Sequence, residues 1–265
     1  MDMIKVLDEH GYISLVETWG SEERIVEAAR MSTGKGFNGW GGDRCPTCDA
    51  AGRLDSAGLM NRHSDIEDAR ACCGGTGRTT GDEKLLRFLY TNHHATPFEM
   101  AGMTIEVQAP IFVFREWHRH RTQSYNEMSA RYTPLPDVNY VPSVERLLIN
   151  SKTNKQAGTI AGAAELTPSD AELYRQGLIN MYVDQEAMYR KALAAGVPKE
   201  LARVHIGVGR FSRMRASANL RNWLGFLTLR MASSAQWEIR QYANAVANLV
   251  QRAFPRTYEL FAEGK

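Results

Sequence analysis

The chain has 265 residues, of which 43% are hydrophobic and 23% charged, so it is long enough to bury a sizeable core. Its 32 Lys and Arg residues against 30 Asp and Glu leave a net charge of +2, which disfavours a surface built to coat nucleic acid. No apolar run approaches the roughly 18 residues of a membrane helix, and the first residues lack a signal-peptide pattern. We therefore expect a cytoplasmic protein with no membrane and no nucleic-acid partner.

Hydrophobic spacing and turn residues predict more helices than strands. In the first half of the chain we expect strands at 4–7 and 12–17 around a turn at Gly11, helices at 22–29 and 83–92, a strand at 103–109 and a helix from Pro110 to about Arg121. An extended connection is expected at 132–142. In the second half we expect helices from Pro168 to about 195 and from Pro198 to Ile206, a weakly alternating strand at 211–218, a helix at 220–229 and a last helix to about Phe254. No series of alternating strands and helices and no repeat is present, so the expected fold class is α+β.

Short polar residues mark the expected helix starts. Ser21, Thr167 and Asn219 each precede a helical run, which predicts that they cap the helices that follow. The string from Ser233 to Gln236 resembles a capping box for the last helix. Gly196 predicts the end of the long helix, because glycine readily adopts the left-handed backbone found at helix C-termini.

Two segments depart from plain amphipathic spacing. From residue 33 to 81 glycine, cysteine and polar residues dominate, with one short possible helix at 65–69, so this stretch is interpreted as an insertion. The long helix has an apolar stripe at three- and four-residue steps, which we interpret as packing rather than as a cofactor site. The stripe consists of Leu178, Met181, Tyr182, Met188, Tyr189 and Ala192.

Cationic residues are concentrated in two runs. Between Glu200 and Glu238 the chain has no acidic residue, and the arginines there are Arg203, Arg210, Arg213, Arg215, Arg221 and Arg230. The second run, with only Glu116 and Glu127 as internal acids, comprises Arg115, His118, Arg119, His120, Arg121 and Arg131. Any single arginine has an acid elsewhere in the fold as an alternative partner, but the two runs together favour a site for phosphate-bearing ligands.

The strongest chemical signal follows the helix that begins at Pro110. Residues 119–132 read RHRTQSYNEMSARY, which places Arg119 and Arg121 at a helix end beside many side-chain donors and acceptors. Guanidinium groups hold phosphate oxygens in two parallel hydrogen bonds, so this patch suits a nucleotide. The alternative is a helix terminus whose cations favour the negative end of the helix dipole, followed by a polar loop.

This string matches, without a gap, the signature RHRxxSxNExSxR(Y/F), and the chain therefore resembles the flavin-dependent thymidylate synthases. Further similarity lies at 94–99, 109–113, Arg203, 219–221, 229–230 and 235–239. The resemblance implies a single domain over residues 1–265, with a foreign Gly- and Cys-rich segment inserted at 37–78. It also implies an α+β subunit with a central antiparallel or mixed sheet flanked by helices, and a homotetramer whose active sites are shared between chains.

The same resemblance implies an enzyme, an FAD-dependent methyltransferase that converts dUMP to dTMP. In this family 5,10-methylenetetrahydrofolate supplies the carbon, and FAD reduced by NADPH supplies the hydride. We do not expect Ser129 or a cysteine to act as nucleophile. No base stands at helical spacing from Ser129, and all the cysteines lie in the inserted segment.

Carried over position by position, the resemblance implies the site residues. Those expected to bind FAD are His94, Thr96, Arg119, His120, Arg121, Glu127, Asn219 and Arg221. Those expected to bind dUMP are Arg119, Glu127, Met128, Ser129, Ala130, Arg131, Arg203 and Arg230. Arg230 is the expected catalytic residue, because it takes the position that grips the uracil ring and favours its ionised form.

Three positions depart from the family pattern. Glu116 stands where many relatives have Gln, and its carboxylate would lie near a bound phosphate unless Arg115 or Arg119 neutralises it. We therefore do not expect Glu116 to touch the nucleotide as that Gln does. Gly225 replaces an Asn that often contacts flavin, and Ser234 replaces a His and fits the capping role.

The inserted segment contains all 4 cysteines of the chain. Cys45 and Cys48 have the spacing of a zinc knuckle, and Cys73 opens a Cys-Gly-Gly-Thr-Gly string that resembles half of a zinc repeat. Cys72 is adjacent to Cys73, which would strain a tetrahedral site, and His63 is an alternative ligand. The spacing leaves two alternatives open, a structural zinc or a loose loop with reduced cysteines.

A competing interpretation is a nucleic-acid-binding protein, in which the insert and the arginines contact phosphates while Trp40 and Trp117 stack on bases. The near-zero net charge and the full-length similarity disfavour it. Colour distinguishes the two, because a flavoprotein is yellow and shows an oxidised-flavin absorption spectrum.

Overall fold

The structure is a computed structural model that describes residues 3–54, 56, 60, 73, 76–78, 81–151 and 154–264. The expected helix at 65–69 lies outside these residues. The chain groups into two compact units. The first unit comprises Met1–Val16, Thr104–Ser217 and Phe226–Val246, and the second comprises Glu17–Met103, Ala218–Gly225 and Ala247–Lys265.

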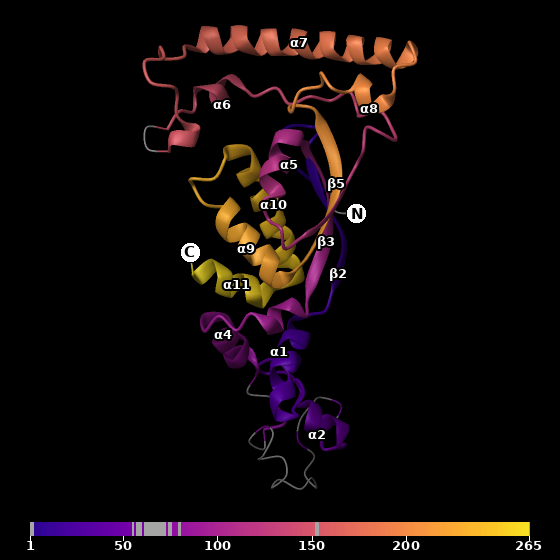
Figure 1. Ribbon diagram of the computed structural model, residues 1–265. Coiled ribbons are helices and arrows are strands. Elements are labelled where there is room, and N and C mark those ends of the chain that lie inside the picture. The colour runs from indigo at the N-terminus through magenta and orange to yellow at the C-terminus, as the bar shows by residue number, and fades with distance from the viewer. Residues whose placement is uncertain are drawn as a thin grey trace. The chain divides into compact units, whose positions relative to one another are not determined.

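The strands of the described chain form a 5-stranded sheet in the order β1-β2-β3-β5-β4 (Figure 1). Their bounds are β1 (Met3–Lys5), β2 (Tyr12–Trp19), β3 (Gly102–Pro110), β4 (Ser124–Glu127) and β5 (Phe211–Asn219). β1 pairs antiparallel with β2, and β4 pairs antiparallel with β5, with Tyr125 opposite Ala216. A Cβ at Gly11 would overlap the carbonyl oxygen of Val6, so the close approach between β1 and β2 requires glycine.

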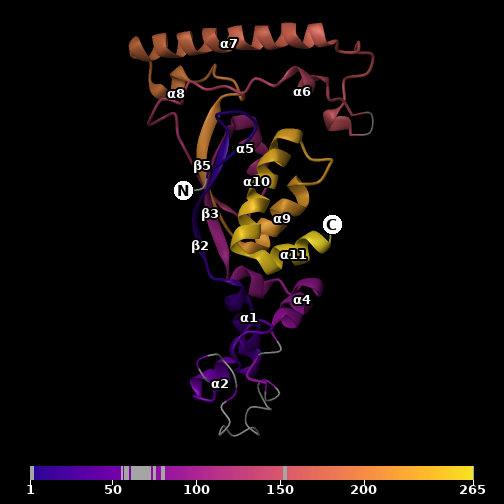
Figure 2. The same ribbon diagram turned by 180° about the vertical axis from the view of Figure 1, so that it is seen from behind.

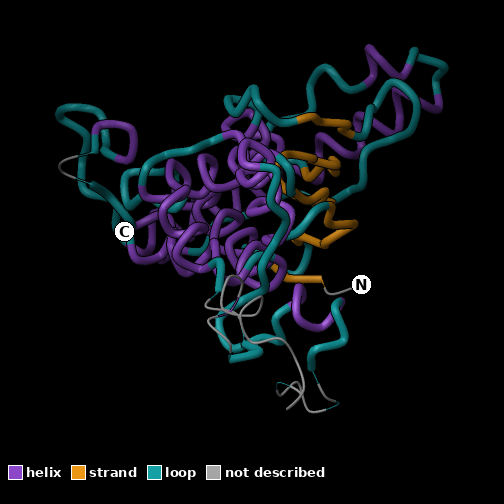
Figure 3. The backbone as a smooth tube through the Cα atoms, turned by 90° about the horizontal axis from the view of Figure 1, so that it is seen from below, coloured by secondary structure: helices purple, strands orange, loops and turns teal. Residues whose placement is uncertain are grey.

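Helices flank this sheet and confirm the α+β class (Figure 3). Their bounds are α1 (Glu22–Arg30), α2 (Pro46–Ala50), α4 (Glu83–Thr91), α5 (Ile111–Trp117), α6 (Val144–Leu148), α7 (Pro168–Ala194), α8 (Lys199–Ala202), α9 (Leu220–Arg230), α10 (Trp237–Ala253) and α11 (Pro255–Glu263). Short 3-10 turns are η1 (Met31–Thr33), η2 (Thr96–Glu99) and η3 (Lys155–Ala157). Within the described ranges, no helix has both the length and the apolar character needed to span a membrane.

The predicted helix caps are confirmed. The side chains of Ser21, Thr167 and Asn219 each accept a hydrogen bond from the backbone N–H three residues later, at 3.4, 3.2 and 3.0 Å. α7 ends at Ala194, and Gly196 follows with a φ of 83°. These features depend on neighbouring residues alone, which is why the sequence pattern predicts them.

The helix predicted to run from Pro110 to Arg121 ends earlier, because α5 stops at Trp117. The hydroxyl of Tyr125 donates to the carbonyl oxygens of Trp117 and His120, at 3.2 and 2.7 Å. It thereby satisfies acceptors that a longer helix would have used. The segment that follows, for which a polar loop was the alternative to a binding site, contains β4, which pairs with β5.

The C-terminal helices also differ from the prediction. α8 ends at Ala202 rather than Ile206, and α10 begins at Trp237, so the predicted capping box at Ser233 is wrong. A further helix, α11, follows α10. Pro255 has no N–H to continue the hydrogen bonding of α10, and it takes the first position of α11, where that N–H is not needed.

The core of the first unit surrounds Trp117, which is fully buried. Its ring stacks on Phe226 with centroids 4.6 Å apart and meets the edge of Tyr242, and its Nε1 donates to Gln123 at 3.1 Å. The hydroxyl of Tyr242 in α10 donates to the carbonyl of Gln108 in β3 at 2.9 Å. These contacts hold the end of α5, and with it the turn that follows, against the sheet.

Still within the first unit, α7 packs against α6 and α8 (Figures 1 and 2). Tyr182 and Tyr189 of the predicted stripe are buried, and Tyr182 donates to the carbonyl of Tyr140 at 3.2 Å. Met181 and Met188 are instead 42% and 60% exposed. The interpretation of the stripe as packing is therefore wrong for these methionines within the single chain.

In the second unit, the buried carboxylate of a glutamate in α1 binds the start of α11. The carboxylate of Glu22 accepts a hydrogen bond from the backbone N–H of Thr257 at 2.6 Å and lies 3.9 Å from the guanidinium of Arg256. Arg256 also lies over the ring of Trp40, 4.2 Å from its centroid, and Trp40 Nε1 donates to Glu23 at 2.7 Å. The beginning of the inserted segment is thus anchored to both helices.

Candidate active site

The two cationic runs of the sequence meet at Arg230, the last residue of α9. Its side chain is 15% exposed. Nη1 donates to Glu116 Oε2 at 2.9 Å, Nη2 donates to the Glu116 carbonyl at 2.7 Å, and Nε donates to His120 Nε2 at 2.8 Å. Arg230 and His120 are 110 positions apart in the chain, so the fold of the first unit brings them together.

His120 is a neutral imidazole in this arrangement. A guanidinium only donates hydrogen bonds, so Nε2 of His120 carries the lone pair and Nδ1 carries the proton. Burial, and then the positive charge of Arg230, lower the pKa of His120 to about 4, although Glu116 acts in the opposite direction. At neutral pH the imidazole therefore adds no charge beside Arg230.

Glu116 is neutralised by Arg230, and not by Arg115 or Arg119 as the sequence suggested. Both its carboxylate and its backbone carbonyl accept from the same guanidinium, and the carboxylate is 43% exposed. The side chain thus occupies one edge of Arg230. A ligand that binds this guanidinium has to share it with Glu116 or displace the carboxylate.

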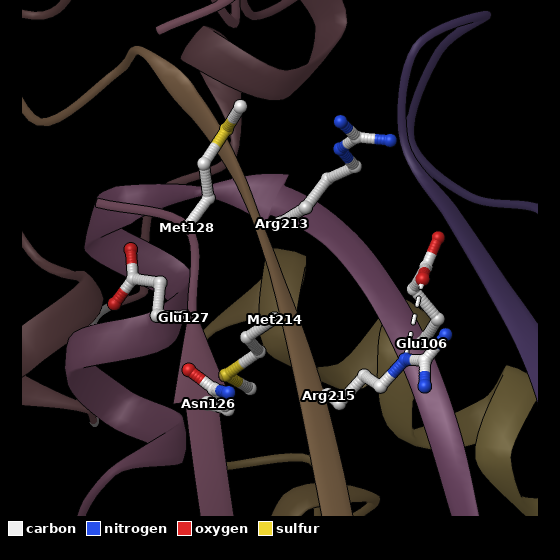
Figure 4. Close-up of a pocket in the computed structure, with 7 residues that line it drawn as sticks. All are labelled: Glu106, Asn126, Glu127, Met128, Arg213, Met214 and Arg215. Carbon is white, nitrogen blue, oxygen red and sulfur yellow. Dashed lines mark ion pairs between the residues drawn. The ribbon is translucent and has the colours of Figure 1, made fainter. Parts of the chain in front are cut away.

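Strands β3, β4 and β5 border a cavity of about 430 Å³ in the first unit (Figure 4). Its lining residues are Glu106, Asn126, Glu127, Met128, Arg213, Met214 and Arg215. The backbone N–H of Met128 donates to the carbonyl of Arg213 at 2.7 Å, which joins the signature string to β5. Glu106 and Arg215 point toward one another as an ion pair of 3.6 Å.

Of the residues that line this cavity, the sequence predicted Glu127 and Met128 as site residues and placed the arginines in a cationic run. Glu106 was missed, because a single acid on an alternating strand forms no recognisable motif. Its carboxylate also accepts from the hydroxyl of Tyr12 at 2.9 Å. Burial and this hydrogen bond raise the pKa of Tyr12.

The rest of the signature string forms a turn after β4. The hydroxyl of Ser129 accepts from the backbone N–H of Arg131 at 3.3 Å, and Ala130 between them is buried. Arg131 is exposed, with its guanidinium 3.7 Å from the carboxylate of Glu200. Arg203 is half-buried at the C-cap of α8.

Arg119 and Arg121 are exposed in the turn after α5. Arg131, Arg221 and Arg230 each have an ion-pair partner, whereas none is found for Arg119 or Arg121 in the part of the chain that the structure describes. Two guanidinium groups of the first unit can therefore receive anions from a ligand.

The second unit contains the other four residues predicted to bind flavin: His94, Thr96, Asn219 and Arg221. His94 is exposed and meets the edge of the Phe88 ring, with centroids 5.4 Å apart. Thr96 begins η2, and Asn219 caps α9. Arg221 donates to Glu99 at 2.5 Å, a partner that the sequence did not single out as a site residue.

The departures from the family pattern have clear structural settings. Gly225 is exposed on α9, and a Cβ added there would meet no atom within 4 Å, so no side chain takes the place of the usual Asn. Ser234 lies in the turn before α10 rather than at a helix cap, and its carbonyl accepts from Asn154 at 2.9 Å.

The inserted segment brings three sulfur atoms together in the second unit. The Sγ atoms of Cys45, Cys48 and Cys73 all lie within 4.8 Å of one another, and all three residues are buried. Cys72 and His63 lie outside the described residues. None of the residues predicted to bind FAD or dUMP belongs to this group, so it is a separate candidate site.

Comparison with known proteins finds similarity along nearly the whole chain. The family model described as "Thymidylate synthase complementing protein" matches residues 14–256. A protein of Anaplasma marginale named "Flavin-dependent thymidylate synthase" is 32% identical over 260 residues, which cover 98% of this chain and 74% of that protein. A protein of the same name from Thermus thermophilus is 34% identical over 262 residues, covering 98% and 78%.

Solved structures agree with the sequence comparison. The UMP/dUMP methylase PolB from Streptomyces cacaoi, bound with 5-Br UMP, matches with a TM-score of 0.70 and 26% identity, covering 98% of this chain and 96% of that one. The same protein bound with 5-Br dUMP gives a TM-score of 0.69, also at 26% identity, over 98% and 97% of the two chains.

Proposed function

The chain belongs to the thymidylate synthase complementing protein family, that of the flavin-dependent thymidylate synthases, and from this premise we propose that it methylates dUMP to dTMP. In the proposed reaction 5,10-methylenetetrahydrofolate supplies the carbon, and NADPH reduces the FAD. The contact between His120 and Arg230 carries the proposal, because the signature string and the second cationic run meet there.

The chemistry of the described residues fits an FAD. In the first unit, Arg119 and Arg121 expose guanidinium groups that suit a pyrophosphate. In the second, Arg221, Thr96 and Asn219 offer a cation and hydrogen-bonding side chains at the surface. When bound, the reduced flavin supplies the hydride, while these residues hold and orient it.

Arg230 is proposed to hold the uracil ring of dUMP. Activation of the ring develops negative charge, and a guanidinium already held in place stabilises that charge more in the transition state than in the ground state. Neutral His120 orients Nε of Arg230 without adding a second charge. Glu116 orients the opposite edge and competes with the substrate for it.

The remaining residues of the proposed dUMP site surround or follow β4. The cavity lined by Glu127 and Met128 has the volume of a small-molecule site, about 430 Å³. Ser129, Arg131 and Arg203 would bind the nucleotide, and the guanidinium of Arg131 has its carboxylate partner at a loose 3.7 Å. Arginine suits the dianionic phosphate of a nucleoside monophosphate.

We further propose that the active form is a homotetramer with shared sites. Tyr174, Met181 and Met188 follow one another at seven-residue steps along α7 and are 56%, 42% and 60% exposed. Large apolar side chains in such a row favour burial by another copy of the chain. We also place the protein in the cytoplasm, because the described cysteines form no disulfide.

The experiment that tests the function measures dTMP formed from dUMP, 5,10-methylenetetrahydrofolate and NADPH by the purified yellow protein. Each component is omitted in turn, and UMP replaces dUMP in a parallel reaction. We expect dTMP only in the complete mixture, in step with NADPH oxidation. A colourless protein that binds nucleic acid and forms no dTMP after addition of FAD would support the competing interpretation.

Assembly is tested on the same preparation. Light scattering should give a mass of about four chains for the active species, as expected for a closed homo-oligomer. A fully active monomer would contradict the shared site.

A further inference from the structure

The inserted segment encloses a group of sulfur atoms with the dimensions of a metal site. Cys45, Cys48 and Cys73 are 2%, 0% and 2% exposed, and their Sγ atoms lie within 4.8 Å of one another. The Sγ atoms of Cys48 and Cys73 are 3.6 Å apart. Four sulfurs at about 2.3 Å from a tetrahedral zinc ion are separated by about 3.8 Å, so the observed spacing needs little adjustment.

Backbone contacts join the chain at Cys45 and Cys48, the first half of this group, to the chain after Cys73, the second half. The N–H of Cys45 donates to the carbonyl of Gly77 at 2.9 Å, and an isolated antiparallel bridge joins Arg44 to Arg78. These contacts link the residues just before the first cysteine pair to those just after Cys73. The sulfurs are therefore brought together by backbone pairing as well as by the spacing of the cysteines.

Each half of the group also has a local turn of its own. Cys45 precedes α2 as its N-cap, and Cys48 lies within this helix. The carbonyl of Cys48 accepts from the N–H of Arg53 at 2.8 Å. The carbonyl of Cys73 accepts from the hydroxyl of Thr76 at 2.8 Å. These hydrogen bonds fix the backbone at Cys48 and Cys73, and the side chains of both are buried.

A purely apolar core does not account for this group. Its buried members are Cys45, Cys48, Leu54 and Cys73, with Met60 packed against them. Among the described residues of the insert, thiols make up most of this cluster, and Leu54 and Met60 add little apolar area to it. Small domains of this kind depend on a metal or on disulfides.

Nor does a disulfide account for it. The described cysteines form no disulfide, and the 3.6 Å between Cys48 and Cys73 far exceeds the sulfur–sulfur bond of about 2.05 Å. A disulfide between these two would also leave the third thiol buried beside it without a role.

We propose that Cys45, Cys48 and Cys73 bind one zinc ion as thiolates. Binding forms three sulfur–zinc bonds and releases the three thiol protons to solvent, with no change of oxidation state. The fourth ligand comes from outside these three residues and is not assigned. The ion folds the inserted segment and takes no part in methylation, so this proposal does not depend on the proposed function.

Elemental analysis of the full-length protein, purified under reducing conditions without chelator, tests the proposal. We expect about one zinc per chain in the wild type. Cys45→Ser, Cys48→Ser and Cys73→Ser should each reduce the zinc content at least about tenfold, because a structural zinc needs all of its ligands. Thr47→Ser, at the exposed residue between the first two cysteines, is the matched control and should retain the metal.

A second measurement uses the wild-type protein alone, so that a variant that fails to fold does not decide the outcome. A chelator should make Arg44 and Arg53 sensitive to trypsin, and added zinc should restore protection. Added Co²⁺ should produce thiolate-to-cobalt absorption bands in the difference spectrum, which zinc abolishes.

Two outcomes would overturn the proposal. One is a wild-type protein that contains no zinc, binds no Co²⁺ and shows no protection on addition of either ion. The other is full zinc content in all three serine variants. Iron in place of zinc would overturn the identity of the ion.

Discussion

The two candidate sites, Arg230 with its neighbours and the cysteine group, differ in how far apart their residues lie in the sequence and in how deeply they are buried. Arg230 meets Glu116 and His120 across 114 and 110 positions of the chain, at partly exposed side chains held by hydrogen bonds. The cysteines lie close in sequence and are buried. Spacing alone therefore suggests Cys45 and Cys48 as a pair of candidate ligands, whereas the partners of Arg230 become apparent only once the first unit has folded.

The two regions also differ in what stabilises their fold. Arg230 is half-buried in the first unit beside Glu116 and His120, and we expect the surrounding fold to persist when its guanidinium is removed. In the described part of the inserted segment the buried cluster consists mostly of thiols, so we expect this part to depend on its anchor at Trp40 and on the proposed metal. A change beside Arg230 should therefore alter chemistry, and a change in the insert should alter stability.

The largest expected effect is on stability, at Trp40. This residue is 6% exposed, lies under Arg256 and donates to Glu23. Trp40→Ala should lower the free energy of unfolding by about 3 kcal/mol, which corresponds to a fall in Tm of roughly 6–12 °C. Trp40→Phe keeps a ring beneath the cation and should lose less.

Calorimetry with bound zinc and FAD quantified in the same samples provides the measurement. An unchanged Tm in the alanine variant would show that the beginning of the insert is not anchored to α1 and α11. The proposed difference in stability between the inserted segment and the surroundings of Arg230 would then be wrong.

The next effect is catalytic. Arg230→Ala should slow dTMP formation by about tenfold to a hundredfold, because losing a charged hydrogen-bonding group costs about 1.5–3 kcal/mol of transition-state stabilisation. Arg230→Lys should recover part of the rate, since an ammonium does not reproduce the planar fork. Zinc content and Tm should change little.

Reduction of FAD by NADPH is measured separately in the Arg230 variants. It should proceed almost normally, because it does not involve the uracil ring. If methylation is unimpaired, Arg230 has no activating role; if the variant loses its flavin, Arg230 belongs to cofactor binding instead.

A smaller effect is expected at Glu116, which in the proposed mechanism competes with the substrate for Arg230. Glu116→Gln keeps a hydrogen-bond acceptor but removes the charge. Partly exposed ion pairs contribute about 0.2–1 kcal/mol, so the KM for dUMP should fall by no more than about fivefold while kcat changes little. Steady-state kinetics at saturating folate and NADPH measure this, and a rise in KM would show that the carboxylate assists binding.

The last expected effect concerns pH. His120 has a pKa of about 4 in the folded chain, against an ordinary value of 6.5. Between these values the unfolded chain binds a proton that the folded chain does not, so acidification from pH 6.5 to 4 should destabilise the protein. His120→Asn, which does not titrate, should show a weaker fall in Tm over that range.

Titration of the His120 ring by NMR checks the pKa directly. In Arg230→Ala the repelling cation is gone, so the pKa of His120 should rise. A ring that titrates near 6.5 in the wild type would contradict the neutral acceptor.

Local signals predicted much of the fold. The caps at Ser21, Thr167 and Asn219 hold, because each depends on one side chain and the turn that follows it. The end of α5 was mispredicted, because the hydroxyl of Tyr125 decides it from outside the helix. α7 was misjudged for a related reason, since amphipathic spacing does not say whether an apolar row is covered by the same chain.

In the candidate site, too, some residues were predicted from local sequence signals and others were not. The signature string suggested the residues from Arg119 to Arg131 at once, because their identities and spacing are themselves the signal. The pairing of Arg230 with Glu116 was not predictable from spacing, because two helices had to pack before those side chains met. Glu106 had no signal of any kind in the sequence.

The cap at Asn219 also decides which chemical groups that residue can recognise. Its Oδ1 accepts the backbone N–H of Asn222, so the Nδ2 amide group is the donor that this side chain can offer to a ligand. A partner at this position must therefore present an acceptor, such as a carbonyl or phosphate oxygen. Asn219→Asp would cap α9 equally well but would replace that donor with a second carboxylate oxygen. If Asn219 binds flavin as proposed, we expect this change to turn attraction for a flavin oxygen into repulsion while leaving the helix intact.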